Sequence, residues 1–339
     1  MDNKRIIVAV DAMGGDNAPG AIVEGAVMAV NGSEDVEIKL VGKQEVVEAE
    51  LAKYTYDKSR IEVINATEII ETAEKPTLAI RRKKDSSLVV AMKLLKEDKA
   101  DAFVSAGSTG AVLVGGNAIV GRIKGIERPP LGPVLPSATG TFILIDCGAN
   151  VDVRSDHLVQ FAQMGSIYMK EIMGIENPRV AIVNNGAEEE KGNALVKETF
   201  PLLKECPDIN FIGSIEAIRI PAGDADVVVC DGFVGNVVLK MYEGVGLTLF
   251  KEIKKTIMSS LHGKIAGAMI KKDLKKMMKQ YDASEYGGSP MIGLNKLVVK
   301  SHGSSDAKEI MNSIYQCVQF TEADITGKIR AKLGTENKA

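Results

Sequence analysis

Residues 6–16 read IIVAVDAMGGD, a short β-branched run that ends in an aspartate and a glycine-rich turn. The same order of apolar run, turn and helical stretch recurs along the chain. The expected strands are residues 6–10, 36–41, 61–64, 102–104, 142–145, 180–183, 227–229 and 296–300. Several of these runs are apolar on both faces, which is typical of strands in a parallel sheet covered by helices on each side. The sequence therefore predicts an α/β fold with a mainly parallel sheet.

The length of the chain allows two domains or one large α/β unit, because a domain usually spans roughly 100 to 200 residues. The 339 residues are 45% hydrophobic and 26% charged, which is an ordinary globular composition. The sequence has no internal repeat and no Pro/Ser-rich linker that would divide it. We therefore expect a single domain over residues 1–339.

Composition also narrows the classes of partner. A net charge of −3, the absence of Trp and an aromatic content of 4% argue against a nucleic-acid-binding surface. The charged N-terminus lacks the apolar region of a signal peptide, and the longest apolar stretch, residues 110–121, is shorter than a membrane span. We expect a cytoplasmic protein whose chain does not cross the membrane.

The sequence offers little metal or thiol chemistry. His157, His262 and His302 lack a metal-ligand spacing such as HExxH, so metal catalysis is not expected. The four cysteines form no CxxC pair, and we expect reduced thiols. Cys230, beside Asp231, could serve as a nucleophile, but a buried core thiol is the commoner case.

Polar and glycine-rich turns follow most of the expected strands. In an open α/β sheet, ligands gather at the carboxyl ends of the strands, so these turns are the candidate site. They are DAMGGD at 11–16, SAGSTG at 105–110, DCGAN at 146–150, residues 184–193, DGFVGN at 231–236 and SHGSSD at 301–306. We expect several of them to converge on one pocket.

Residues 105–110 have the composition of an anion site. Ser108 and Thr109 place hydroxyl donors at the start of a helix, where backbone N–H groups carry partial positive charge. An ordinary N-cap in a tight turn would use the same residue types, so that alternative stays open. Neither GxxxxGK[ST] nor GxGxxG occurs here, and nucleotide binding gains no support.

Three side chains stand out in the later turns. Lys191 lies at the start of a helix, where a cation opposes the helix dipole unless it faces a bound anion. A solvated lysine is the alternative. Asn236 could donate to an anion or merely cap a helix. His302 could contact a phosphate or hold its turn.

The apolar pattern of residues 247–281 predicts a projecting pair of helices, interrupted near His262 and Gly263. The apolar positions recur at helical spacing and are Phe250, Ile253, Ile257, Leu261, Ile265, Met269, Leu274 and Met278. The lysines outnumber Glu252 and Asp273, and they are Lys251, Lys254, Lys255, Lys264, Lys271, Lys272, Lys275, Lys276 and Lys279. This basic amphipathic hairpin could lie on an anionic membrane surface or dock on a partner. An ordinary surface helix or a dimer interface is the alternative.

Two basic clusters are candidate contacts for a membrane or a partner protein. In the hairpin, these contacts are Leu261, Ile265, Met269, Lys271, Lys272 and Lys275. Arg81 and Arg82, followed by Lys83 and Lys84, form the second cluster. It could dock an acidic protein or be a solvated face.

The turn motifs together resemble one family. They are DAMGGD at 11–16, SAGSTGA at 105–111, DCGAN at 146–150, EEKGN at 189–193, DGFVGNVVLK at 231–240 and HGSS at 302–305. In this order they resemble the bacterial phosphate acyltransferase family over essentially residues 6–327. Two positions depart from the family pattern: Ser289 stands where alanine is usual, and Ser108 stands where asparagine is usual. Ser108 still offers a hydrogen-bond donor, but it lacks the side-chain amide of asparagine.

The resemblance implies a three-layer α/β/α fold similar to isocitrate and isopropylmalate dehydrogenases and to phosphotransacetylase. It implies reversible transfer of a fatty acyl group from acyl carrier protein to inorganic phosphate, without a cofactor, giving acyl phosphate for phospholipid (phosphatidic acid) synthesis. It also implies a homodimer, peripheral association with the inner face of the cell membrane, and a membrane glycerol-3-phosphate acyltransferase as a further partner.

The residues fit this chemistry, because phosphate is itself the nucleophile and a thiolate leaves readily. Positioning and charge stabilisation then remain for the protein. We assign phosphate binding to Gly14, Gly15, Ser105, Gly107, Ser108, Thr109 and Gly110. Lys191 would offset the phosphate charge, and Asn236 would donate to the thioester oxyanion. Further substrate contacts are expected from Asn150, Asn184, Asp231, Gly235, His302 and Ser304.

Three alternatives remain open. A phosphotransacetylase-like enzyme would use acyl-coenzyme A in place of the carrier protein. A dehydrogenase of similar fold would need a nucleotide fingerprint or a metal-carboxylate cluster, for which Asp11, Asp16 and Asp231 are the available residues. A non-catalytic scaffold on the membrane surface would bind acyl carrier protein without releasing a thiol.

Overall fold

The first of two sheets contains the strand that opens the chain. The computed structural model describes residues 5–335. In the first sheet the order is β10 (Ser289–Met291), β11 (Leu297–Lys300), β4 (Ala102–Ser105), β1 (Ile6–Asp11), β2 (Val36–Gly42) and β3 (Ile61–Asn65). All neighbours are parallel except β10 and β11.

The second sheet carries the middle of the chain. Its order is β5 (Val134–Pro136), β6 (Thr141–Ile145), β9 (Val227–Val229), β7 (Arg179–Asn184) and β8 (Asn210–Glu216). Only the pair β5 and β6 is antiparallel. The expected strands form, and the α/β class with parallel-dominated sheets is confirmed. The sequence predicted a single sheet, whereas the strands form two sheets.

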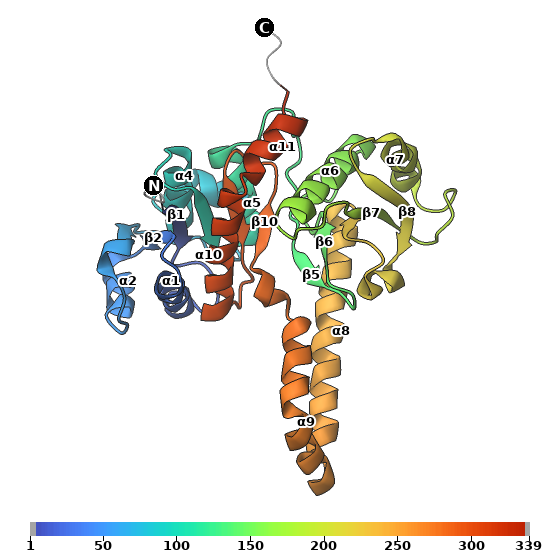
Figure 1. Cartoon of the computed structure of the whole chain (residues 1–339). Coiled ribbons are helices and arrows are strands. Elements are labelled where there is room, and N and C mark those ends of the chain that lie inside the picture. Colours follow the sequence, from blue (N-terminus) through green and yellow to red (C-terminus); the bar gives the residue numbers. More distant parts are fainter. Residues whose placement is uncertain (1–4, 336–339) are drawn as a thin grey trace.

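The two sheets meet edge to edge through residues 130–132. Leu131 pairs with Met291 of β10, and the Ile292 N–H donates to the Pro130 carbonyl at 3.0 Å. On its other edge the same segment bonds to the end of β6, where the Cys147 N–H donates to the Leu131 carbonyl at 2.9 Å. The segment therefore fixes one sheet relative to the other. Figure 1 shows the two sheets side by side.

Helices cover both faces of the sheets, as the doubly apolar strands predict. In β1, Val8 and Val10 join the core beneath α1 and α10, whereas Ala9 faces the core beneath α4. The main helices are α1 (Gly20–Gly32), α2 (Gln44–Leu51), α3 (Pro76–Arg82), α4 (Ser87–Lys96), α5 (Thr109–Gly115), α6 (Ser155–Glu171), α7 (Ala194–Glu205), α10 (Ala307–Glu322) and α11 (Ile325–Leu333).

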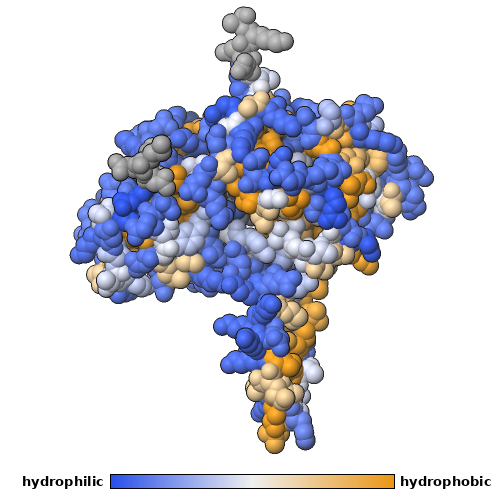
Figure 2. All heavy atoms as spheres, viewed as in Figure 1, coloured by the Kyte–Doolittle hydropathy of each residue, from blue (hydrophilic) through white to orange (hydrophobic). Residues whose placement is uncertain are grey.

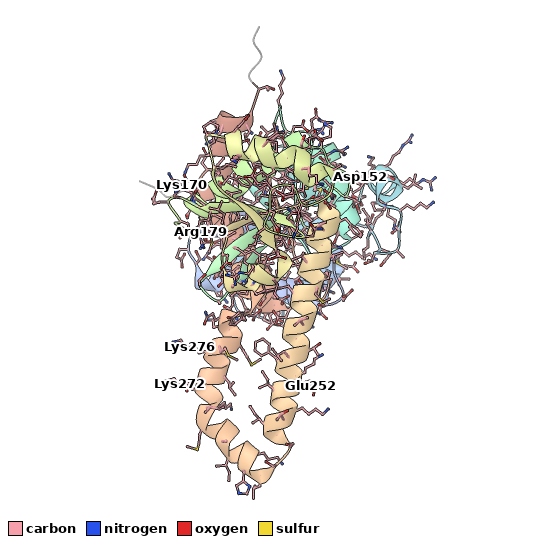
Figure 3. The ribbon with its side chains drawn as sticks, turned by 90° about the vertical axis from the view of Figure 1, so that its right-hand side faces the viewer. Asp152, Lys170, Arg179, Glu252, Lys272 and Lys276 are labelled. Atoms are coloured by element: carbon pink, nitrogen blue, oxygen red, sulfur yellow. The ribbon has the colours of Figure 1, made fainter. Side chains whose placement is uncertain are left out.

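A pair of long helices, α8 (Gly232–Met258) and α9 (Leu261–Gln280), projects from the body (Figure 1; Figure 3). The pair is longer than the predicted 247–281, because α8 begins directly at the end of β9. The turn lies at Ser259 and Ser260, not at His262 and Gly263, because the Ser260 Oγ caps α9 by accepting from the Gly263 N–H at 3.0 Å.

By length and composition, α8 is the one helix in residues 5–335 that could cross a membrane. Its sequence contains no long uninterrupted apolar run, because Lys240 and Glu243 lie within it, so the sequence pattern did not predict a possible membrane span here. The Tyr242 hydroxyl, however, donates to the Pro136 carbonyl at 2.6 Å, and the Tyr242 ring packs edge-on against Phe142. The first third of α8 is thus part of the folded body, and composition alone does not place the helix in a bilayer.

Candidate active site

Three polar side chains line up across the ends of the central strands of the first sheet. Asp11, Ser105 and Lys300 end β1, β4 and β11, and the register places them side by side on one face. The Ser105 Oγ donates to the Asp11 Oδ2 at 2.7 Å. All three residues are buried. Apolar strands thus end in a compact polar row at the carboxyl edge, where α/β enzymes bind ligands.

The environment shifts the pKa of both charged members of this row. Burial raises the pKa of Asp11, and hydrogen bonds from Ser87 and Ser105 oppose that effect. Burial lowers the pKa of Lys300 to about 8, with Asp11 and Asp16 opposing and Lys240 reinforcing the change.

Glycines allow the three loops beyond this row to meet. A Cβ on Gly14 would lie 2.5 Å from the Asp11 Oδ2 and 2.8 Å from the Gly107 N, so a larger residue would separate the loops. Gly15 has a φ of +107° and abuts Gly303. The structure therefore brings Gly14, Gly15 and Gly107 together as predicted, while phosphate binding itself stays a prediction.

The third loop is bonded to the first through its backbone. The Asp16 N–H donates to the Gly303 carbonyl at 2.7 Å, and the Asn17 Nδ2 donates to the Ser304 carbonyl at 2.9 Å. His302 is exposed, and its Nδ1 lies 2.8 Å from the Ser304 Oγ. His302 and Ser304 thus hold the turn, and a phosphate contact from either one stays a prediction.

The end of the 105–110 loop has the local role expected of a helix cap. The Ser108 Oγ accepts from the Ala111 N–H at 3.4 Å, so Ser108 caps α5. Thr109 is exposed, and Gly110 lies against Pro76, the first residue of α3. The loop is therefore joined to the helix that carries Arg81 and Arg82.

The end of β6 in the second sheet is organised by a buried carboxylate. Asp146 accepts from the N–H groups of Leu131, Ala149 and Asn150 at 2.9, 3.1 and 2.6 Å. The Asn150 Nδ2 adds a bond at 2.9 Å. Burial raises the pKa of Asp146, and these hydrogen bonds oppose the shift. Asn150 is thus part of the scaffold of this turn.

Helix α8 starts against that scaffold. A Cβ on Gly235 would lie 1.9 Å from the Asp146 carbonyl oxygen, so the contact requires glycine. Asn236 is exposed on the first turns of α8, next to Gly148, whose added Cβ would lie 3.6 Å from the Asn236 Cβ. Lys240 lies one turn beyond Asn236 on the same helix face. Its charge contributes to the lowered pKa of Lys300.

A cavity of about 590 Å³ lies at the ends of β7 and β9. Asn184 and Asp231 line it, together with Gly192, Asn193 and several aliphatic side chains. Asp231 also caps α8, because its Oδ1 accepts from the Phe233 and Val234 N–H groups at 2.9 Å each. The structure therefore brings Asn184 and Asp231 together, although Asp231 has a structural role as well.

Lys191 lies at the rim of the same region, paired with an acid. Its Nζ is 2.9 Å from the Glu188 Oε2, and this ion pair raises the pKa of Lys191. Both side chains are about half exposed. The Asn184 Nδ2 donates to the Lys191 carbonyl at 3.3 Å. Lys191 thus lies in the loop before α7 and Asn236 on α8. The joint catalytic role assigned to them stays a prediction.

The cysteines near these loops are poor nucleophiles. Burial raises the pKa of Cys147 and of Cys230 well above the ordinary value, so both remain thiols at neutral pH. In residues 5–335, no group of three or more His, Cys, Asp or Glu side chains is arranged to hold a metal ion.

Comparisons with known proteins show the family to which the chain belongs. The family described as "Fatty acid synthesis protein" matches residues 6–328. The phosphate acyltransferase of Clostridium perfringens is 50% identical over 326 residues, 96% of each chain. That of Clostridium acetobutylicum is 48% identical over 328 residues, 97% of this chain and 99% of the relative. The chain belongs to the bacterial phosphate acyltransferase family. It is an acyltransferase, and its reaction is acyl transfer to phosphate.

Solved structures resemble the acyltransferase in fold. The EutD phosphotransacetylase from Staphylococcus aureus has a TM-score of 0.61 at 17% identity and covers 95% of both chains. A phosphotransacetylase from Streptococcus pyogenes has a TM-score of 0.61 at 19% identity, over 95% of this chain and 94% of that chain. At such identities the likeness shows the fold alone.

Sequence reasoning missed one side chain of the acyltransferase. Lys300 ends the otherwise apolar run LVVK, and a single lysine there carries no periodic signal. Its place beside Ser105 and Asp11 depends on the pairing of β11 with β4. The available signal was that a lysine immediately precedes a glycine- and serine-rich turn.

Proposed function

We propose that the acyl donor is a fatty acyl group on acyl carrier protein and that the product is acyl phosphate for phospholipid synthesis. The observation that carries the proposal is the convergence of the loops after β1, β4 and β11 on the row of Asp11, Ser105 and Lys300. Such a small polar row, backed by glycines and close backbone N–H groups, suits a compact anion.

In this mechanism phosphate attacks the thioester directly. A phosphate oxygen bonds to the carbonyl carbon, the tetrahedral oxyanion collapses, and the C–S bond breaks so that the thiolate leaves with the electron pair. A thiol of pKa about 8.5 is a good leaving group near neutral pH. The buried Cys147 and Cys230 supply no thiolate, which favours direct attack over an acyl-enzyme. The exposed Asn236 amide is the candidate donor to the oxyanion.

A basic surface beside the loop supports a protein donor. Arg81 and Arg82 are exposed at the end of α3, whereas Lys83 pairs with Glu74 at 2.5 Å. The start of α3 touches the loop at Gly110. Since a helix rises about 1.5 Å per residue, Arg82 is about 9 Å along the axis from that contact. An acidic carrier protein bound there would hold its thioester close to the loop.

The cavity at the start of α8 suits the fatty chain. Its aliphatic lining includes Leu158, Ile182, Leu195, Val196 and Val234. Its volume of about 590 Å³ is in the usual range for small-molecule sites, roughly 300 to 1,000 Å³. Burying methylene groups there would favour long acyl chains over acetyl groups.

The hairpin supports a peripheral membrane location on the cytoplasmic side. Leu261, Ile265 and Met269 of α9 are 73%, 57% and 80% exposed. Figure 2 shows apolar atoms along the hairpin, and Figure 3 shows Lys272 and Lys276 on its projecting part. We propose that this element contacts the inner face of the cell membrane, where a glycerol-3-phosphate acyltransferase would take the product. The alternative is that the hairpin contacts a second copy of the chain in a homodimer.

The deciding experiment compares thioester donors. Acyl carrier protein and coenzyme A, each carrying the same long acyl chain, are incubated with the enzyme, and free thiol is measured with and without phosphate. We expect phosphate-dependent release from the carrier protein with the higher kcat/KM. A higher kcat/KM for acyl-coenzyme A would contradict the proposal that acyl carrier protein is the donor. Binding of the carrier protein without release of free thiol would indicate a non-catalytic scaffold.

Liposome pelleting tests the location of the hairpin. Acidic replacements at Lys271, Lys272 and Lys275 should abolish binding to vesicles that contain anionic lipid. Acidic replacements at Lys53, Lys58 and Lys99, distant in the sequence and exposed, are the matched control. Unchanged pelleting of the hairpin variant would contradict a membrane role.

A further inference from the structure

We propose that Lys300 is the cation that binds the phosphate substrate of this acyltransferase. The inference rests on the proposed function, because it takes phosphate as the nucleophile at the first-sheet loops. Lys300 ends β11 and is 8% exposed. Its neighbour in the register is Ser105, whose hydroxyl is bonded to Asp11.

The ammonium group of Lys300 lies between two of the converging loops. Its Nζ donates to the Ala106 carbonyl at 3.4 Å and to the Ser301 carbonyl. Ala106 belongs to the loop after β4, and Ser301 to the loop after β11. The charge is therefore placed where the backbones meet, and not on the surface where most lysines lie.

Lys300 differs from the other buried cation in making no salt bridge, although the charges of Asp11 and Asp16 act on it. Arg60 and Lys300 are the two buried residues of the arginine and lysine type in the described part of the chain. Arg60 pairs with Glu34 at 3.3 Å and donates to the Val36 carbonyl at 2.9 Å. Lys300 makes no ion pair with any carboxylate of residues 5–335. Its ammonium group donates to two backbone carbonyls.

An anion is the missing partner that this arrangement favours. A buried charge is costly unless it is paired, so an entering anion would gain from pairing with Lys300. The nearby carboxylate of Asp11 already accepts from Ser105 at 2.7 Å and from the Met13 N–H at 3.3 Å. The flanking glycines, Gly14 and Gly107, let small groups approach closely.

The surrounding charges make this cation sensitive to pH. Asp11 at the end of β1 and Asp16 in the loop after it raise the pKa of Lys300, whereas Lys240 on α8 lowers it together with burial. The pKa of about 8 means that the free enzyme loses this positive charge as the pH rises through about 8. A bound dianion favours the charged form, so anion affinity should fall above that pH.

Steady-state kinetics of three variants test the assignment. Lys300→Met should raise the KM for phosphate at least tenfold and leave the KM for the acyl donor within twofold. Lys300→Arg should retain much of the phosphate affinity, because arginine keeps the charge. Lys296→Met is the matched control, since Lys296 precedes the same strand and pairs with Asp98 at 2.9 Å. A folded Lys300→Met enzyme with an unchanged KM for phosphate would overturn the proposal.

Sulfate binding gives a readout that does not depend on turnover or on the folding of the methionine variant. Sulfate keeps its charge over this pH range, whereas phosphate changes charge near neutrality. Calorimetric titration of the wild type should show a constant Kd below about pH 8 and a Kd that rises up to tenfold per pH unit above it. Lys300→Arg should show a nearly flat profile.

The two readouts separate this inference from the proposed function. Absence of phosphate-dependent thiol release by the wild type would contradict the proposed function. A pH-independent sulfate Kd in the wild type, or a profile of the same shape in Lys300→Arg, would contradict the role of Lys300.

Discussion

The buried charge of Lys300 should have a measurable cost in stability. Burial lowers its pKa from 10.5 to about 8, a change of about 2.5 units. Each unit corresponds to about 1.4 kcal/mol, so keeping this charge in the folded protein costs about 3 kcal/mol below pH 8. Lys300→Met removes that cost but leaves two carbonyl oxygens without a donor, at about 1 kcal/mol each. We expect the variant to be slightly more stable than the wild type at pH 7.

The pH dependence of this difference is the sharper result. Between about pH 8 and pH 10.5 the unfolded Lys300 binds a proton that the folded one has lost, so wild-type stability rises with pH over this window. The stability difference between Lys300→Met and wild type should therefore change by about 3 kcal/mol in favour of the wild type from pH 8 to pH 10.5, which reverses its sign. Groups that titrate in both proteins cancel in the difference.

Urea-induced unfolding followed by far-UV circular dichroism measures both quantities. Wild type and Lys300→Met are compared at several pH values, with Lys296→Met as the control whose difference from wild type should stay nearly constant. Saturating sulfate should flatten the wild-type profile, because the anion keeps Lys300 charged. A pH-independent difference between Lys300→Met and wild type would refute the reasoning that burial lowers the pKa of this lysine.

Three further perturbations test other parts of the structure. Ser105→Ala removes the donor to Asp11 and should destabilise the protein by about 1.5–3 kcal/mol in urea unfolding; an effect below about 0.5 kcal/mol would contradict the bond. Gly235→Ala places a Cβ against the Asp146 carbonyl, so it should lower the stability by about 1–3 kcal/mol and also impair turnover. A variant that unfolds at the same temperature as the wild type would rule out the close contact. Val196→Trp fills the cavity and should lower kcat/KM for long-chain donors more than for short-chain donors; equal losses would place the acyl chain elsewhere.

The convergence of loops could be predicted in part. The runs before Asp11 and Ser105 are apolar on both faces, so parallel strands and a site at their carboxyl ends followed from pattern alone. The structure confirms that these loops meet. It also shows that they form one group on the first sheet, whereas Asn184 and Asp231 line a cavity on the second. No local pattern indicated this division, because sheet membership depends on pairings between distant segments.

The hairpin of α8 and α9 also could be predicted only in part from the sequence. The helical spacing of apolar residues predicted two helices, but the turn was placed three residues late, at His262 and Gly263. Glycine suggested a break, whereas Gly263 lies inside α9 and permits close approach to Ile257. The position of the turn is decided by the cap at Ser260 and by packing between the helices.

The sequence by itself determined where the strands run and which turns carry polar and glycine residues, because β-branched runs and turn residues act on the backbone within a few positions. The tertiary structure alone decided that Lys300 stands beside Ser105 and Asp11. Those residues are separated by most of the chain, and only the parallel pairing of β11, β4 and β1 puts them in one row. Such pairing is set by packing of the whole core and leaves no local trace in the sequence.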